Sequence, residues 1–138
     1  MTEPAGKDPK LAAAEQDFDN ALREELLRQC WDRLEAWEQQ KERPYYTVLR
    51  MRSERPGLPS HRMARELEER LGRSFTADNV RQILHRAREM FAGRLLEIVA
   101  NSITIPSQEE LENELIRLNL LEYCKPTLDR WRDCERPE

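Results

Sequence analysis

The chain has 138 residues, of which 36% are charged and only four are glycine, and its formal net charge is −4. This length suits one domain with appended helices and argues against a multidomain enzyme. Abundant Leu, Glu and Arg, without any alternating Val/Ile/Thr-rich run, predict an all-α fold. The sequence contains no secretory signal and no apolar span of about 20 residues, so we expect a cytoplasmic protein that does not enter membranes.

Charge is divided unevenly along the chain. Residues 1–42 carry 6 basic and 11 acidic side chains, residues 43–100 carry 12 and 7, and residues 101–138 carry 5 and 9. The basic side chains of the middle segment are all arginine, whose planar guanidinium forms paired hydrogen bonds with phosphate or guanine. The middle segment is therefore the candidate for contact with nucleic acid.

The sequence offers no catalytic or metal-binding pattern. Its three cysteines, Cys30, Cys124 and Cys134, are far apart and include no close-spaced ligand pair. The acidic run at 109–114 has no accompanying histidine, which is typical of a solvated helical face. We find no nucleophile beside a base and no glycine-rich phosphate loop. We therefore expect no enzyme activity, no cofactor, no metal and no small-molecule substrate.

The first predicted elements are a tail and a long helix. Residues 1–17 are small, polar and proline-bearing, which predicts a disordered tail or the remnant of a linker. A long helix is predicted from about Phe18 to Gln40. Its apolar positions recur at helical spacing, at Leu27, Cys30, Trp31 and Leu34. We expect the tryptophans of this helix to pack against other side chains rather than stack on bases.

Two shorter helices follow in the basic segment. Residues 45–55 predict a short helix that ends before the turn at 56–59, which holds two prolines and a glycine. Ser60 is then the predicted N-cap of a helix that reaches Leu71, and Gly72 is its predicted C-cap.

The segment VRQILHRAR, residues 80–88, combines an apolar stripe with a basic face. Thr76 is the predicted N-cap of this helix, which we expect to run to about residue 100. The apolar stripe consists of Val80, Ile83, Leu84, Ala87 and Phe91. Two helices with a short connection, the second bearing a polar arginine face, predict a helix-turn-helix over residues 60–100. The candidate DNA contacts are Asn79, Arg81, Gln82 and His85 for base edges, and Arg86 and Arg88 for phosphates.

The remaining segment, residues 102–138, predicts a helical tail. Ser107 and Glu110 form a capping box at the start of one helix, and Asn119 ends that helix in the left-handed conformation. A last short helix is expected around 126–131. The leucines of this tail would pack against the helix-turn-helix or dock onto a partner. The predicted organisation is a tail over 1–17, a helical domain over 18–101 and the helical tail.

The chain resembles a known family over residues 18–131. VRQILHRAR resembles the helix-turn-helix signature of region four of bacterial RNA polymerase sigma factors, and MARELEERLG is similar to the first helix of that motif. The flanks REELLRQCW, YYTVLRMRSE and LNLLEYCKPTLDR resemble the carboxy-terminal half of sigma-like proteins of planctomycete-type bacteria. The resemblance implies two partners, the −35 element of promoter DNA and the β flap of the RNA polymerase core. It gives the DNA role to Arg81, Gln82, His85, Arg86 and Arg88.

Three departures from the family pattern limit what the resemblance implies. Ala64 and Val80 are 16 positions apart, several more than is usual in the family. Ile83 stands where an arginine is common, so one expected DNA contact is lost. No aromatic-rich helix of the kind that melts the −10 element occurs. We therefore expect a chain that does not open promoters by itself, either as a piece of a longer factor or as a stand-alone module.

A protein-interaction module is the alternative function. In this case the acidic outer segments cover the basic middle or bind a basic partner, and the protein is a regulator of polymerase or of a sigma protein. The alternative predicts salt-insensitive association with that partner and negligible affinity for DNA. A DNA reader predicts an affinity for duplex that falls steeply with salt, because each neutralised phosphate releases condensed counterion.

Overall fold

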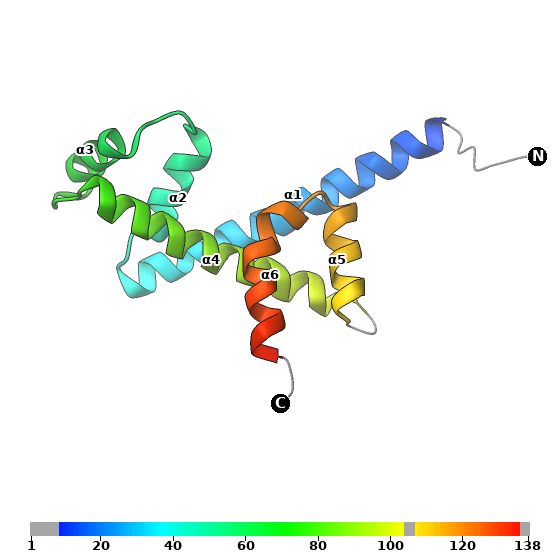
Figure 1. Cartoon of the computed structure of the whole chain (residues 1–138). Coiled ribbons are helices and arrows are strands. Elements are labelled where there is room, and N and C mark those ends of the chain that lie inside the picture. Colours follow the sequence, from blue (N-terminus) through cyan, green and yellow to red (C-terminus); the bar gives the residue numbers. More distant parts are fainter. Residues whose placement is uncertain (1–8, 104–106, 136–138) are drawn as a thin grey trace, which may run out of the picture. The chain divides into compact units, whose positions relative to one another are not determined.

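A computed structural model describes residues 9–103 and 107–135, and every regular element in these ranges is an α-helix. The helices, drawn in Figure 1, are α1 (Pro9–Lys41), α2 (Tyr45–Glu54), α3 (Ser60–Leu71), α4 (Ala77–Asn101), α5 (Gln108–Arg117) and α6 (Leu121–Glu135). The all-α fold predicted from the composition is confirmed. None of these helices combines the length and the apolar character needed to cross a bilayer.

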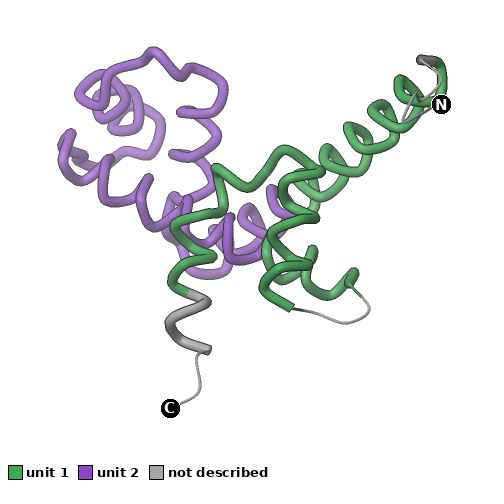
Figure 2. Tube along the Cα trace, turned by 45° about the vertical axis from the view of Figure 1, so that its right-hand side comes forward, with its two compact units in different colours: residues 1–29, 95–138 green, residues 30–94 purple. Residues whose placement is uncertain are grey.

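The chain divides into two compact units, which Figure 2 colours separately. Unit 2 consists of residues 30–94, and unit 1 consists of the described parts of residues 1–29 and 95–138. The helices α1 and α4 each supply residues to both units. This division differs from the expected helical domain over residues 18–101, because residues 18–29 and 95–101 are grouped with the tail helices.

The long first helix begins at Pro9 rather than near Phe18. Residues 1–8 of the expected tail lie outside the described residues, whereas residues 9–17 are helical, so the prediction of a tail is wrong there. Proline is favoured at the first helical position, where its missing N–H has no intrahelical partner to lose. Leu, Ala, Glu and Gln then dominate the next turns, and these residues have the highest helix propensities.

The core of unit 2 is apolar and rich in aromatic side chains. The Trp31 ring packs edge-on against Tyr46 and Phe91, with centroid distances of 5.8 and 4.9 Å, and Trp37 lies 4.7 Å from Tyr45. The predicted packing role of these two tryptophans is confirmed. The other large buried side chains of unit 2 include Leu34, Val48, Leu49, Met51, Met63, Leu67, Val80 and Leu84.

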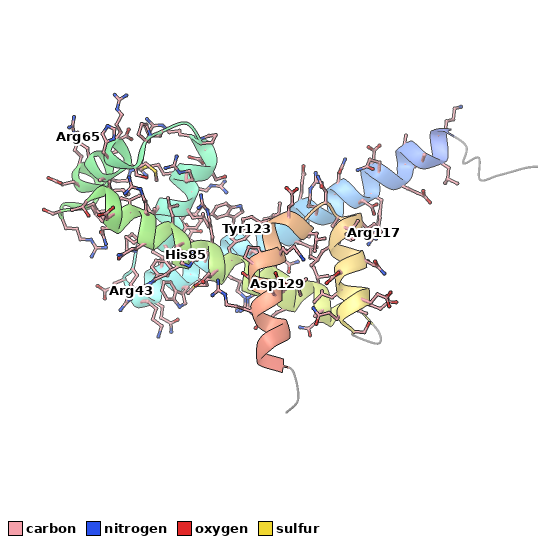
Figure 3. All side chains as sticks on the ribbon, viewed as in Figure 1. Arg43, Arg65, His85, Arg117, Tyr123 and Asp129 are labelled. Carbon is pink, nitrogen blue, oxygen red and sulfur yellow. The ribbon has the colours of Figure 1, made fainter. Side chains whose placement is uncertain are left out.

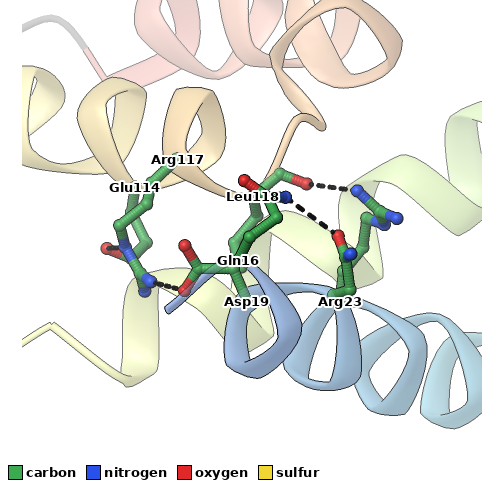
Figure 4. A network of polar contacts seen from close by, with 7 residues as sticks. Gln16, Asp19, Arg23, Glu114, Arg117 and Leu118 are labelled. Atoms are coloured by element: carbon green, nitrogen blue, oxygen red, sulfur yellow. Dashed lines mark hydrogen bonds and ion pairs between the residues drawn. The ribbon is translucent and has the colours of Figure 1, made fainter. Parts of the chain in front are cut away.

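Unit 1 combines a leucine core with a polar network at its surface. The guanidinium of Arg117 in α5 pairs with Asp19 of α1 and with Glu114 of its own helix, as Figure 4 shows. Arg23 of α1 donates to the carbonyl oxygen of Leu118 at 3.4 Å. The buried side chains are Leu26, Leu95, Leu96, Val99, Leu111, Leu115, Leu118, Leu120, Cys124 and Leu128. These contacts explain why the start of α1 belongs with the tail helices.

Most predicted helix ends match the structure. Ser107 accepts a hydrogen bond from the backbone N–H of Glu110 at 3.1 Å, which confirms the Ser107 half of the predicted capping box. Asn119 has a φ of 61°, which confirms the predicted left-handed residue after α5. The prediction of Ser60 as an N-cap is wrong, because Pro59 occupies the cap and Ser60 is the first residue of α3. Pro59 has φ −65° and ψ 152°, an extended conformation that its ring favours and that delivers the chain into the helix. The last helix is longer than the predicted 126–131.

Candidate nucleic-acid interface

Local hydrogen bonds fix the connection between α3 and α4. Gly72 has a φ of 74°, and its N–H donates to the carbonyl of Glu68 at 2.9 Å, so it ends α3 in the left-handed conformation. The hydroxyl of Thr76 accepts from the N–H of Asn79 at 3.0 Å, and its carbonyl accepts from Val80. The predicted C-cap of α3, Gly72, and the predicted N-cap of α4, Thr76, are thus confirmed, and they determine where the first turn of α4 begins.

The first half of α4 separates apolar from polar side chains, as the sequence predicts. Its core face buries Val80, Leu84, Ala87 and Phe91, whereas Ile83, also predicted for the apolar stripe, is only half-buried. All the predicted DNA contacts are exposed, namely Asn79, Arg81, Gln82, His85, Arg86 and Arg88. The helix therefore presents its hydrogen-bonding side chains to the surface of unit 2.

The exposed side chains of α4 form two stripes rather than one. Asn79, Gln82 and Arg86, at helical spacings of three and four, line a surface groove together. They span about 10 Å along the helix axis. The second stripe, Arg81, His85 and Arg88, does not line this groove. We call the first set the groove stripe and the second set the outer stripe.

Two members of the outer stripe are paired within α4. Arg81 donates to the carboxylate of Asp78 at 2.6 Å, and the Nε2 atom of His85 lies 3.2 Å from a Glu89 oxygen. Exposed pairs of this kind contribute only about 0–1 kcal/mol, so a stronger partner can replace the carboxylate. Arg88 has no carboxylate partner among the described residues. Figure 3 labels His85 on α4.

The groove beside α4 has a volume of about 260 Å³ and is lined by three segments. These are residues 42–45 at the α1–α2 junction, residues 73–75 between α3 and α4, and the groove stripe together with Ile83. Arg43, Arg73 and Arg86 contribute three guanidinium groups to it, against the single carboxylate of Glu42. None of these arginines forms an ion pair with a described residue. The groove is therefore a basic surface with unused hydrogen-bond donors.

Arg43 and Arg73 are not among the residues that the sequence predicted as DNA contacts. Arg43 lies between α1 and α2, and Arg73 lies between α3 and α4. Their positions near the groove stripe depend on how α1, α2 and α3 pack within unit 2. The exclusive use of arginine between residues 43 and 100 was the available signal, since it marks both residues as members of the basic segment. That signal could not tell them from the other arginines of the segment.

An ion pair between Arg55 and Glu66 helps to hold α2 against α3 within unit 2. Arg55, at the end of α2, donates to both carboxylate oxygens of Glu66 in α3, at 2.6 and 2.9 Å. The hydrogen bonds from Arg55 lower the pKa of Glu66, and the same contact raises the pKa of Arg55. A bidentate contact of this kind fixes the orientation of the guanidinium relative to the carboxylate as well as the distance between them.

The described residues contain no evident metal centre. Within this part of the chain, no group of three or more His, Cys, Asp or Glu side chains is placed to hold a metal ion. Burial raises the pKa of the Cys30 thiol to about 11, although the charge of Arg94 opposes the shift. Because the thiolate is the reactive form of cysteine, Cys30 is a packing residue at neutral pH.

Comparison of the chain with protein-family models, with curated proteins and with solved structures found no match. The resemblance to sigma region four therefore stays a prediction from the sequence. The candidate interface stands on its own geometry and charge.

Proposed function

We propose that unit 2 binds duplex DNA as a helix-turn-helix, with α3 as the supporting helix and the first half of α4 in the major groove. The observation that carries this proposal is the groove stripe, whose side chains are exposed and have no described hydrogen-bond partner. Asn and Gln side chains can pair with adenine, and arginine can pair with guanine or phosphate. The length of the stripe, about 10 Å, matches a major groove about 12 Å wide.

The opposite face of the same helix supports the proposal. A reading helix has to be held firmly while its outer face meets DNA, and α4 is held by Val80, Leu84 and Ala87, each at most 4% exposed. Thr76 caps its first turn, where residues closest to base edges lie in helix-turn-helix proteins. The polar face is thus preorganised rather than assembled on binding.

The resemblance of residues 63–72 and 80–88 to sigma region four suggests the biological role that we propose. In that role the protein is a module of a transcription initiation factor, acts in the cytoplasm and binds a −35-type promoter element. It also docks on the β flap of the RNA polymerase core, and it has no melting activity of its own. The longer spacing from Ala64 to Val80 and the isoleucine at position 83 predict a base preference that differs from the family's.

One observation favours the alternative, a protein-interaction module. Arg81 and His85 are already paired with acidic residues of α4, as in many surface helices that contact no nucleic acid. On this alternative the chain binds polymerase or a sigma protein, and the salt dependence of DNA binding is absent.

The discriminating experiment measures affinity and base preference together. A preferred duplex is first selected from a pool with a random core, and its affinity is then compared with that of the unselected pool by fluorescence anisotropy over a salt series. Gln82→Ala should weaken binding to the selected duplex by about 1–3 kcal/mol and leave the unselected pool nearly unchanged, because it removes a base contact. Arg88→Ala should weaken both duplexes alike, because it removes a phosphate contact.

The matched control is Gln39→Ala, which changes an exposed glutamine of α1 within unit 2 but outside the groove. The control should leave both affinities unchanged. If neither Gln82→Ala nor Arg88→Ala changed the affinity for duplex DNA, the assignment of α4 as the reading helix would be overturned. Absence of salt-dependent duplex binding by the unsubstituted chain would favour the interaction module.

A further inference from the structure

The basic groove of unit 2 has arginines on both of its sides. Arg86 comes from α4, whereas Arg43 and Arg73 come from the two connections that face it. We infer that this groove holds the sugar-phosphate backbone of one DNA strand, with Arg43 and Arg73 as phosphate contacts. This inference rests on the proposed function and adds residues that lie outside the predicted helix-turn-helix face.

The α1–α2 junction holds Arg43 in a defined position. Glu42 ends α1 with a φ of 59°, and its N–H donates to the carbonyl of Glu38 at 2.8 Å. The two carboxylate oxygens of Glu38 accept hydrogen bonds from the backbone N–H and the hydroxyl of Thr47, at 2.9 and 2.8 Å. Glu38 thereby caps the first turn of α2 from outside that helix. The backbone on both sides of Arg43 is fixed before any ligand arrives, which lowers the entropic cost of binding.

Arg73 is oriented by a different contact. It follows the left-handed Gly72, and its guanidinium carbon lies 5.4 Å from the centroid of the Phe75 ring. Phe75 is half-buried and lines the groove. An arginine stacked on an aromatic face keeps the N–H groups at its edge available for a planar or phosphate acceptor. The contact with Phe75 thus leaves the N–H groups of Arg73 available for an anionic group in the groove.

The charge and size of the groove favour a phosphate backbone over a small ligand. Three guanidinium groups without described ion-pair partners face one carboxylate, so the groove complements an anion with repeated charges. Its volume of about 260 Å³ is below that of common small-molecule pockets. Asn79 and Gln82 form part of the same wall, so a strand held there would present its bases beside the groove stripe. Phosphate contacts of this kind set the register in which bases are read.

The test measures how duplex affinity depends on salt for the full chain. The probe is a fluorescein-labelled duplex with a random core, and the slope of log affinity against log salt concentration is compared among variants. Arg43→Gln and Arg73→Gln should each reduce the magnitude of this slope by about 0.9, the contribution of one phosphate contact in B-form DNA. The ratio of affinities for selected and random duplexes should stay unchanged, because neither arginine reads bases.

The matched control is Arg65→Gln, an exposed arginine of α3 that does not line the groove and that stands away from Arg43 in Figure 3. Circular dichroism of each variant checks that its helix content is unchanged, and Arg43→Glu provides a stronger perturbation of the same position. Unchanged slopes for Arg43→Gln, Arg43→Glu and Arg73→Gln, with binding still sensitive to Arg88→Ala, would overturn the inference and leave the proposed function standing. If Arg43→Gln and Arg73→Gln reduced the salt slope while Gln82→Ala and Arg88→Ala had no effect, phosphate binding in the groove would be supported. The reading role of α4 would then be overturned.

Discussion

Arg81 donates a hydrogen bond to Asp78, its neighbour one turn earlier in α4, with 2.6 Å between Nη1 and Oδ1. The pair is exposed, with 61% of the Arg81 side chain and 88% of the Asp78 side chain accessible. Asp78 therefore neutralises a predicted DNA contact and places a negative charge where phosphates would approach. If α4 contacts DNA as proposed, Asp78 opposes the contact made by Arg81.

Asp78→Asn is predicted to tighten duplex binding and to weaken the fold slightly. Affinity should rise by up to about fivefold, since an exposed ion pair is worth about 0–1 kcal/mol. The free energy of unfolding should fall by about 0.3–1 kcal/mol, because an acidic side chain in the first turn stabilises a helix through its dipole. Fluorescence anisotropy and urea denaturation measure the two effects. The control Glu35→Gln removes an exposed carboxylate of α1. If both substitutions changed affinity equally, Asp78 would have no specific effect on Arg81.

The two glycines near the interface are predicted to respond in opposite ways to alanine. Gly72→Ala should destabilise the protein by about 1–2 kcal/mol, because the φ of 74° is costly for any residue with a Cβ atom. Gly93→Ala should stabilise it by about 0.5–1 kcal/mol, since this glycine is inside α4 and an added Cβ meets no atom within 4 Å. Urea denaturation of both variants is the measurement. Equal effects of the two substitutions would contradict the left-handed cap at Gly72.

The parts of the fold that sequence predicts well are those fixed by neighbours along the chain. The caps at Thr76, Ser107 and Gly72 form hydrogen bonds with backbone groups no more than four residues away. Their capping roles can therefore be predicted from the sequence. The same is true of the apolar stripe that separates the faces of α4. Exposure of the candidate DNA contacts follows from that stripe.

The parts that sequence misses depend on contacts between distant segments or on competing local preferences. Glu38 caps α2 from α1, and Arg55 pairs with Glu66 of the next helix, so neither role follows from a local pattern. The groove forms only when the α1–α2 and α3–α4 connections lie beside α4, and the spacing of apolar residues does not specify that packing. The predicted tail is wrong over the start of α1 because the small and polar composition of this segment suits a tail, whereas its helix propensity is high.

Leu67 is predicted to be a sensitive position of α3. Its side chain has no exposed surface, and truncation to alanine should lower the free energy of unfolding by about 2–5 kcal/mol through lost burial and the cavity left behind. Leu71→Ala is the matched control, because the same residue type on the same helix is 39% exposed. Its effect should stay within about 0.5 kcal/mol. Similar losses in the two variants, measured by urea denaturation, would contradict the packing of α3.

The Arg55–Glu66 pair predicts a pH-dependent contribution to stability. Its hydrogen bonds lower the pKa of Glu66 below the ordinary value of 4.5, so the folded state favours the ionised carboxylate. The contribution is present above the unfolded pKa and is lost as the pH falls through the folded pKa. Glu66→Gln should therefore lower the melting temperature at neutral pH, and the difference should vanish in acid.

Glu69→Gln, an exposed glutamate of the same helix, serves as the comparison and should show no such loss in acid. Thermal unfolding followed by circular dichroism across the acid range gives both curves. A difference between the original chain and Glu66→Gln that stayed constant down to the lowest pH would show that the pair contributes nothing through ionisation.

The most direct test of the central claim is a map of backbone amide chemical shifts as a random-core duplex is added to isotopically labelled protein at low salt. The account predicts perturbations in residues 79–88, with further changes at residues 42, 43, 45 and 73–75, all reversed by added salt. Changes confined to α5 and α6, or no change at all, would contradict the assignment of α4 and the basic groove as the DNA-binding surface.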